Sequence, residues 1–424
     1  MIENPYQFKG PLDPKKNGLV CIPRAEDVHK VIDGILKSDY WAILGPRQIG
    51  KTTFLRLVQH EFKHAYYIYI DFELHSKSKE ADIYPWLMEK MLSEIPNYSE
   101  TSKAKEWKSG PEQAFFGFLR HFKPKDDDLK VVFLFDEIDA LPFVNDFLHF
   151  WRGVFHERYS HPELEKYIVI TSGAADLIEL SLGPSSPFNI AQVLYLHDFS
   201  GEESELLIDR PFKELGIQIE PGAKDKLLSS LSGHPQMLQH AGHILVDQTL
   251  KSGNSKIYIK NVDGAIQKLF KTNSSLDTLK QDLKDEKLRD LIEHILEGHK
   301  EKFHPYKEYS LRGAGTIVER DSFCSIRNRV FEEFLYNIES SMLKINEEES
   351  EYSLFVKKPW LVILIFAVLL GSISGLTSFG EGIIAAIILI VFSIFFMIIS
   401  TISLEKSSEK KEECQEMKNG GNKV

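Results

Sequence analysis

Five short apolar runs alternate with helix-like segments along the first half of the chain. The runs are rich in β-branched and aromatic residues, as strands buried in a sheet are. They lie at residues 40–44, 65–72, 131–135, 167–171 and 192–196. Strands that alternate with helices are typical of an α/β domain with a parallel sheet. The pattern therefore predicts an α/β core over residues 1–200.

Beyond this core, the spacing of apolar residues becomes helical. Ser200 is a good helix N-cap and is followed by acidic residues, so it opens a set of helices that we expect to form a lid over residues 201–272. Two short alternating runs around Arg320-Asp321-Ser322 predict a β-hairpin. Helices followed by this hairpin indicate a winged-helix-like domain over residues 273–345.

Two long segments near the end of the chain contain no charged residue. They cover residues 359–380 and 382–404 and are mostly apolar. A membrane-spanning helix needs roughly 20 apolar residues, so both segments are long enough. Buried core helices are the alternative, but such helices seldom lack a polar face over this length. We therefore expect two transmembrane helices, joined as a hairpin over residues 359–404, in contact with membrane lipid.

The charges around the two segments predict their orientation. The turn at residues 377–382 has no basic residue, whereas basic residues flank the outer ends. These are Lys357, Lys358, Lys406, Lys410 and Lys411. The positive-inside bias then places the α/β core and both termini in the cytoplasm and the two spans in the cytoplasmic (inner) membrane. An acidic juncture at 346–358 precedes the hairpin, and a mixed-charge tail at 405–424, expected to be disordered, follows it.

A glycine-bounded loop follows the first apolar run and precedes a helix-like segment. Its sequence fits the pattern G-x-x-x-x-G-K-[ST], in which backbone N–H groups surround the phosphates of a nucleotide. The candidate nucleotide-binding residues are Gly45, Pro46, Arg47, Gln48, Ile49, Gly50, Lys51, Thr52 and Thr53. We expect Lys51 to reach the β- and γ-phosphates of ATP and the Thr52 hydroxyl to bind Mg²⁺. A fortuitous glycine turn is the alternative.

An acidic pair ends the third apolar run, at the edge where ligands bind in open parallel sheets. We expect Asp136 to hold Mg²⁺, often through water, and Glu137 to orient or deprotonate an attacking water. Alone, such a pair is more often a solvated strand end, but the upstream loop favours hydrolysis. Lys51 and Glu137 are therefore the candidate catalytic residues. The next run ends in Thr171 and Ser172, where one hydroxyl either contacts the γ-phosphate or caps the strand.

Composition and charge limit the other possibilities. The chain has 424 residues, enough for two or three domains, and a net charge of −11. Because neutralising nucleic-acid phosphates needs a basic face, this charge argues against nucleic acid as a partner. Cys21, Cys324 and Cys414 lie far apart and form no C-x-x-C pair, so we expect reduced thiols that bind no metal.

Four further motifs follow one another along the chain. They are a basic-acidic element at residues 20–27, S-P-F-N-I at residues 186–190 followed by L-H-D-F-S at residues 196–200, Gly233-His234-Pro235, and I-R-N-R-V-F at residues 326–331. Together with the phosphate loop, they resemble the motifs of STAND-class P-loop ATPases, and of their bacterial AAA-like domain branch in particular. The resemblance covers residues 6–340.

This resemblance implies further roles and a mode of action. Arg24 would lie near the base or ribose of the nucleotide, and Pro235 would close over it from the lid. Such proteins are switches in which ATP closes the lid and favours homo-oligomers, while an appended module gives the output. Many relatives carry an arginine where this chain has Gly173, and residues 173–192, where ring-forming AAA+ motors usually place an arginine finger, contain no Arg or Lys, so a standard finger is doubtful. Arg152 or Arg158 could replace it, with surface helix arginines as the alternative.

Functions from different classes remain open at this point. The first is a membrane-anchored regulatory switch with slow ATP turnover, an unknown protein trigger, and an output to the membrane or a partner, as in bacterial signalling or defence. The second is a DNA-associated ATPase that uses its winged helix, but residues 275–345 balance acidic and basic side chains instead of forming a basic stripe. A membrane-bound AAA+ motor is the third, and the missing finger argues against it.

Overall fold

The computed structural model of the protein describes residues 3–95, 98, 110–126, 128–173, 187–284, 286–302 and 315–337. The chain divides into two compact units, Met1–Phe334 and Leu335–Val424. The predicted acidic juncture (346–358), transmembrane hairpin (359–404) and tail (405–424) lie outside the described residues. Within the part of the chain that is described, no helix has the length and apolar character needed to cross a membrane.

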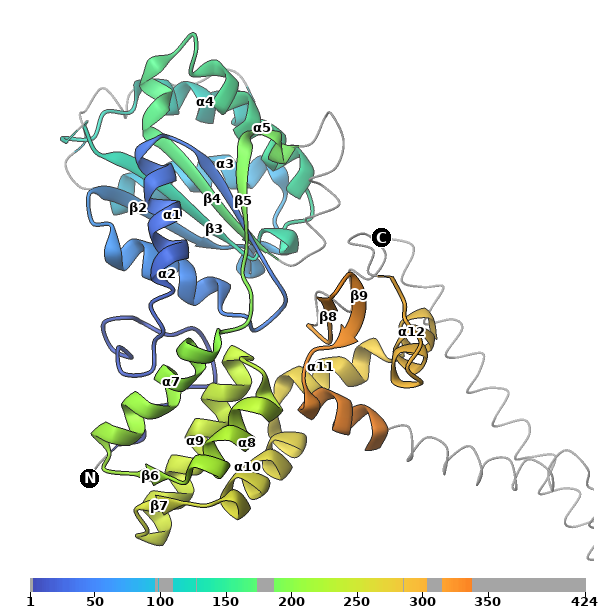
Figure 1. Ribbon diagram of the computed structural model, residues 1–424. Coiled ribbons are helices and arrows are strands. Elements are labelled where there is room, and N and C mark those ends of the chain that lie inside the picture. Colours follow the sequence, from blue (N-terminus) through green and yellow to red (C-terminus); the bar gives the residue numbers. More distant parts are fainter. Residues whose placement is uncertain are drawn as a thin grey trace, which may run out of the picture. The chain divides into compact units, whose positions relative to one another are not determined.

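A five-stranded parallel sheet forms the core of the first unit (Figure 1). Its strands are β1 (Tyr40–Leu44), β2 (Ala65–Asp71), β3 (Lys130–Asp136), β4 (Tyr167–Gly173) and β5 (Ala191–Tyr195). They lie in the order β2-β3-β4-β1-β5, and every neighbouring pair is parallel. All five carboxyl ends therefore meet at one edge of the sheet. The predicted parallel sheet is confirmed, with each strand within two residues of its expected bounds.

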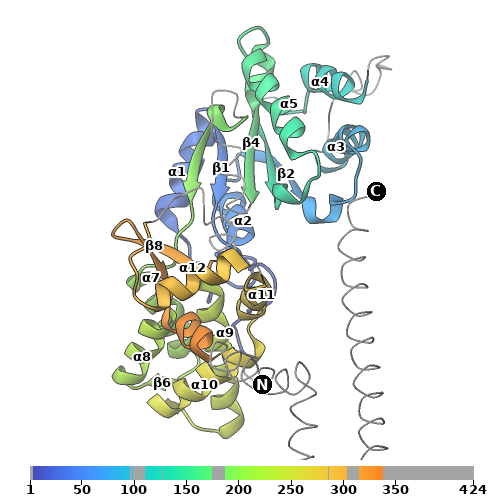
Figure 2. The ribbon, with the colours of Figure 1, turned by 90° about the vertical axis from the view of Figure 1, so that its right-hand side faces the viewer.

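Helices cover both faces of the sheet, because successive residues of each strand point to opposite faces. On one face lie α1 (Ala25–Leu36) and α2 (Lys51–Glu61), and on the other α3 (Glu80–Glu94), α4 (Pro111–His121) and α5 (Val144–Glu157) (Figure 2). Aromatic rings fill the interface between the sheet and α5. The ring centroids of Phe133 and Phe135 on β3 lie 4.7 and 5.6 Å from that of Trp151 on α5. Short 3-10 helices occupy several connections, namely η1 (Phe72–His75), η3 (Ile138–Ala140), η4 (Pro162–Lys166) and η5 (Pro187–Ile190).

Four helices follow the sheet, as the helical spacing predicts. They are α7 (Gly201–Glu214), α8 (Pro221–Leu231), α9 (Pro235–Ser252) and α10 (Ile259–Thr272). The expected cap of α7 is present as a capping box, in which Ser200 and Glu203 each accept a hydrogen bond from the other's backbone N–H. A short parallel pair, β6 (Gln218–Ile219) and β7 (Lys256–Ile257), joins these helices and has no counterpart in the sequence pattern.

The last described elements are two helices and a hairpin. They are α11 (Ser274–Asp282), α12 (Glu286–Leu296), β8 (Ile317–Arg320) and β9 (Phe323–Ile326), and residues 329–337 are again helical. The strands β8 and β9 are antiparallel, and Asp321 and Ser322 between them have φ angles of +51° and +68°. Tight two-residue hairpin turns require such left-handed residues, so the predicted hairpin is present. The division into domains at residues 200, 272 and 345 stays a prediction.

Candidate functional site

The loop between β1 and α2 lies at the carboxyl edge of the sheet. Gly50, the N-cap of α2, has a φ of +96°, a left-handed conformation that favours glycine. A Cβ atom at this position would have no neighbour within 4 Å, so the backbone conformation, not lack of space, requires glycine. The first N–H groups of α2 have no partner within the helix, and the helix dipole adds positive potential there. The loop therefore presents an anion-binding helix N-terminus.

Lys51, the first residue of α2, is buried beneath the loop. Its Nζ donates hydrogen bonds to the carbonyl oxygens of Gly45 (3.3 Å) and Pro46 (3.4 Å). It also lies 4.0 Å from Oε1 of Glu137. A buried ammonium group needs such partners, because burying an unpaired charge is costly. The structure thus brings the two candidate catalytic residues together from separate elements.

Asp136 ends β3 as a buried carboxylate with fixed orientation. Its Oδ2 accepts a hydrogen bond from the Tyr69 hydroxyl at 2.9 Å, and its Oδ1 accepts a short one from the Ser172 hydroxyl. Thr171, the preceding residue of β4, donates instead to the carbonyl oxygen of Trp41 on β1 at 3.3 Å. Ser172 therefore orients Asp136, and Thr171 bonds to the backbone of the neighbouring strand β1. A contact of either hydroxyl with a phosphate stays a prediction.

Glu137 follows Asp136 in the left-handed region, with a φ of +47° that is uncommon for a residue with a side chain. The backbone leaves the strand at this point, and the half-buried carboxylate faces Lys51. Burial raises the pKa of Glu137, the positive charge of Lys51 opposes this, and Asp139, Asp136 and Glu73 add to the rise. Asp136 is therefore held by two hydrogen bonds, whereas Glu137 is a half-buried acid with a raised pKa beside the phosphate loop.

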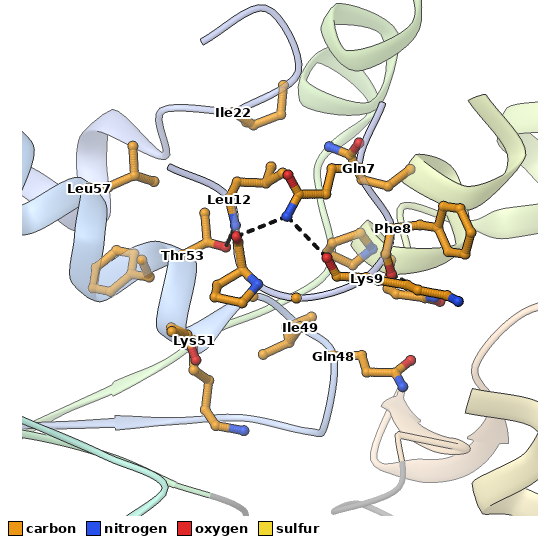
Figure 3. Close-up of a pocket in the computed structure, with 18 of the residues that line it drawn as sticks. Gln7, Phe8, Lys9, Leu12, Ile22, Gln48, Ile49, Lys51, Thr53 and Leu57 are labelled. Carbon is orange, nitrogen blue, oxygen red and sulfur yellow. Dashed lines mark hydrogen bonds between the residues drawn. The ribbon is translucent and has the colours of Figure 1, made fainter. Parts of the chain in front are cut away.

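A cavity of about 430 Å³ opens beside the loop (Figure 3). The loop and the start of α2 contribute Gln48, Ile49, Gly50, Lys51, Thr52 and Thr53 to its lining. Glu137, Arg24 and Pro235 reach it from three other elements. Of the remaining loop residues, Gly45 and Pro46 are buried and Arg47 is exposed, and none of them belongs to this lining.

Arg24 lies just before α1, buried at the wall of the cavity. Its Nη1 donates to the carbonyl oxygen of His197 (3.0 Å) and its Nη2 to that of Ile49 (3.3 Å). The guanidinium group also stacks on the Phe199 ring, 4.7 Å from the centroid. Arg24 therefore ties the phosphate loop to the segment after β5. Its expected contact with the base or ribose stays a prediction.

The lid helix α9 begins at the same cavity. Gly233 has a φ of +79°, and a Cβ atom there would come within 2.2 Å of the carbonyl oxygen of Phe199. Only glycine allows this approach, which fixes the start of α9 against the segment after β5. His234 caps the helix, and Pro235 is its first residue and lines the cavity. The G-x-P-like motif thus lies at the site, whereas closure of the lid stays a prediction.

An N-terminal strap, residues 7–12, also lines the cavity, and the sequence pattern did not predict it (Figure 3). At one end the backbone N–H of Leu12 donates to Oγ1 of Thr53 on α2 at 3.1 Å. Near the other end the Phe8 ring stacks on His240 of α9, with centroids 3.9 Å apart. The strap therefore connects the phosphate end of the site to the lid. Its sequence has neither apolar periodicity nor a motif, and only the extent of the family resemblance pointed to it.

Arg158 is buried, which contradicts its proposed role as a replacement finger, because a finger must be exposed to reach the nucleotide of a neighbouring subunit. The buried guanidinium group donates to the carbonyl oxygens of Ser38 and Tyr167 and stacks on the Tyr40 ring. Tyr40 and Tyr167 begin β1 and β4, so Arg158 lies at the amino edge of the sheet, opposite the phosphate loop. Its hydrogen bonds and burial identify it as a core residue.

The oxygen atoms at the site suit Mg²⁺. Mg²⁺ is usually held by one or two protein oxygens, with phosphates and waters completing an octahedron. Thr52 offers a hydroxyl at the cavity, and Asp136 keeps free lone pairs beyond the two that accept hydrogen bonds. No cluster of three or more His, Cys, Asp or Glu side chains suited to a metal occurs among the described residues.

Comparison with known proteins gives a family and a fold. Residues 17–337 match the family model described as an AAA-like domain. The Walker-type ATPase PABY2304 of Pyrococcus abyssi is similar in structure, with a TM-score of 0.53 and 16% identity over 77% of this chain and 99% of that chain. No curated protein matched.

Two further structures are less similar. For Cdc6p from Pyrobaculum aerophilum the TM-score is 0.45, with 16% identity over 81% of this chain and 97% of that chain. For the RuvB Holliday junction branch migration motor of Thermotoga maritima the TM-score is 0.43, with 12% identity over 73% of this chain and 94% of that chain. At 16% identity, the similarity to PABY2304 establishes the fold alone, which is that of a P-loop ATPase.

Proposed function

Because the chain belongs to the AAA-like domain family of P-loop ATPases, we propose that it is a STAND-type regulatory switch that binds ATP and Mg²⁺ and hydrolyses ATP slowly. The approach of Lys51 to Glu137 at the phosphate loop is the observation that supports hydrolysis. It combines a cation for the phosphates with a carboxylate for the attacking water in one cavity.

The roles of the residues follow from their surroundings. Lys51 and the N–H groups of the loop bind and orient the β- and γ-phosphates and offset the charge that develops on them. Lys51 exchanges its present partners, the carbonyl oxygens of Gly45 and Pro46, for phosphate oxygens. Glu137 accepts the proton of the attacking water, and its raised pKa increases its strength as a base. Asp136 and Thr52 hold Mg²⁺, which neutralises phosphate charge when bound.

A direct contact between the phosphate loop and the C-terminal elements supports the switch. Nε2 of Gln48 donates to Oγ of Ser274 at 3.0 Å, and Oε1 of Gln48 accepts a short hydrogen bond from Ser275. Both serines are at the start of α11. Pro46 lies 3.1 Å from where a Cβ atom of Gly315 would be, just before the hairpin. A rearrangement of the loop on phosphate binding therefore acts on α11 and the hairpin without an intermediary.

The ATPase part is tested with two substitutions. Lys51→Ala removes the charge at the phosphates and should abolish tight ATP binding. Glu137→Gln keeps the shape but loses the base, so it should bind ATP and hydrolyse it about 100-fold or more slowly. Nucleotide retained after gel filtration and single-turnover rates measure both effects. Wild-type turnover by Glu137→Gln would contradict the role of the acid.

The switch part is tested by hydrogen–deuterium exchange in α11. In the wild-type protein, a non-hydrolysed ATP analogue should change exchange over residues 274–282, and Gln48→Ala should lose most of this response while still binding the analogue. Gln59→Ala, at an exposed position of α2, is the control and should keep the response. An equal response in Gln48→Ala would show that the loop does not act through Gln48.

We extend the proposal to assembly and location. ATP favours homo-oligomers, residues 359–404 anchor the protein in the inner membrane, and a protein trigger sets the switch. The uncharged length of the two segments and the positions of the lysines support the anchor. Light scattering of the detergent-solubilised Glu137→Gln protein should show a larger particle with ATP than without it.

A further inference from the structure

Among the described residues, four glutamines line the cavity, and three of them have both ends of the amide engaged. Gln7 donates to two strap carbonyl oxygens (Figure 3) and also accepts a hydrogen bond from Asn17. Gln48 is held by the two serines of α11. Gln236 donates to the carbonyl oxygen of Phe8 and accepts from Asn273. The fourth, Gln239, differs from them.

Gln239 is 6% exposed, and its Oε1 has no hydrogen-bond partner in the described structure. Its Nε2 donates one hydrogen to the carbonyl oxygen of Val20 at 2.7 Å. This bond fixes the orientation of the amide, because the flipped group would place Oε1 against another oxygen. The acceptor Oε1 and the second N–H of Nε2 are therefore available to a ligand. A buried acceptor without a partner costs free energy, which a ligand that donates to it would recover.

The position of Gln239 suits contact with a nucleotide base. It lies four residues after Pro235 on α9, so the two residues share one face of the helix, and both line the cavity. Apolar side chains of Leu12, Ile22 and Leu57 line the same cavity and offer surfaces for the faces of a flat ring. The phosphate loop and Gln239 thus supply polar contacts for the two ends of one ligand.

We propose that Gln239 selects the base of the nucleotide by reading an amino-substituted edge. Its Oε1 accepts a hydrogen bond from the exocyclic amine, and its free N–H donates to the adjacent ring nitrogen. A carboxamide forms this bidentate pair with adenine, whereas a 6-oxo purine turns an oxygen toward Oε1. Cytosine carries a similar edge, so CTP must be distinguished by experiment. The inference rests on the proposed nucleotide site and assigns its specificity.

Binding measurements on the wild-type protein test whether the site prefers a base with an amino-substituted edge. Competition binding compares ATP with inosine triphosphate, purine riboside triphosphate, N6,N6-dimethyl-ATP and CTP. Inosine triphosphate carries an oxygen in place of the exocyclic amine. Purine riboside triphosphate and N6,N6-dimethyl-ATP lack the N–H donors of that amine. We expect ATP to bind on the order of ten- to hundredfold more tightly than these three. Equal affinities would overturn the proposal. CTP that binds as tightly as ATP would support recognition of the amino edge and add a second ligand.

Two substitutions on α9 then assign the preference to a residue. Gln239→Met keeps the volume and removes both polar groups, so ATP and inosine triphosphate should bind within about threefold of each other. Gln236→Met, the control, changes a neighbouring cavity residue whose amide is already engaged, so it should affect all nucleotides alike. A preference that survives Gln239→Met would overturn the proposal. Absence of binding by the wild-type protein to every triphosphate would instead contradict the nucleotide site itself.

Discussion

Glu137 lies at the site with a backbone conformation that is uncommon for a residue with a side chain and with a degree of burial that is unfavourable for an ionised acid. It has a left-handed backbone, it is half-buried, and only Lys51 offers its carboxylate an opposite charge at 4.0 Å among the described residues. The net effect is a raised pKa, with burial as the main cause. In the folded protein the ionised form of this acid is therefore less favoured than it is in an unfolded chain, and the carboxylate takes up a proton more readily, as a general base must.

The pH dependence of stability tests this reading. Because the folded pKa lies above the unfolded value, the contribution of Glu137 to stability is full below the unfolded pKa of 4.5 and is lost as the pH rises through the folded pKa. Glu137→Gln, which cannot ionise, should therefore melt about 1–2 °C above the wild-type protein at neutral pH and converge with it in acid. Thermal melts from pH 4 to 8 measure the difference.

Glu26→Gln is the matched control for that measurement. Glu26 is an exposed acid whose pKa is lowered by its hydrogen bond to Lys30. Its amide variant should gain no stability at neutral pH, because the ionised form is the favoured one. A Glu137→Gln protein that melts at or below the wild-type temperature at neutral pH would show that Lys51 outweighs burial.

At the level of elements, one buried ion pair joins the hairpin region to the sheet. Arg327, just after β9, forms a bidentate pair with Asp198, just after β5, and also donates to the carbonyl oxygen of Gly315. The arginine side chain is 1% exposed. Removing the partner of a buried charge is costly, so Asp198→Asn should lower the free energy of unfolding by about 2–4 kcal/mol. Urea denaturation followed by circular dichroism measures this change.

An exposed arginine–carboxylate pair in the same region serves as the control for Asp198→Asn. Arg329 pairs with Glu333 one helical turn later, but both side chains are exposed. Glu333→Gln should therefore cost less than about 0.5 kcal/mol. If the two acid-to-amide substitutions had equal effects, the pair between Arg327 and Asp198 would not hold the hairpin region in place.

Elements also mark the limit of what the sequence could predict. The five strands were predictable because each is a short apolar run, and the loop and acid pair because their chemistry needs fixed residue types next to strands. The strand order was not predictable from periodicity, yet it places Ser172 of β4 beside Asp136 of β3. Contacts between residues far apart in the sequence could not be predicted from periodicity either. The strap at residues 7–12 and the bond between Gln48 and Ser275 depend on tertiary packing that no local pattern records.

At the scale of the whole molecule, a switch needs both an input site and a route to an output. The nucleotide cavity and the contact of Gln48 with α11, which are the proposed input and the first part of the proposed route, lie within residues 1–334. The proposed output, residues 359–404, follows only a short acidic juncture. Because the nucleotide cavity and the proposed anchor lie in different parts of the sequence, each can be tested independently.

Cysteine labelling of the full chain tests the membrane topology. Cys21 and Cys324 are buried, so Cys414 is a natural probe for the tail. If both ends are cytoplasmic, an impermeant maleimide should leave Cys414 unlabelled in intact cells and label it after permeabilisation, because charged lysines resist transfer across the membrane. In a Cys414→Ser background, Ser378→Cys should react in intact cells, since the turn at residues 377–382 is the only segment expected on the far side. Labelling of Cys414 in intact cells would exclude the hairpin, and a protein recovered without the membrane fraction would exclude the anchor.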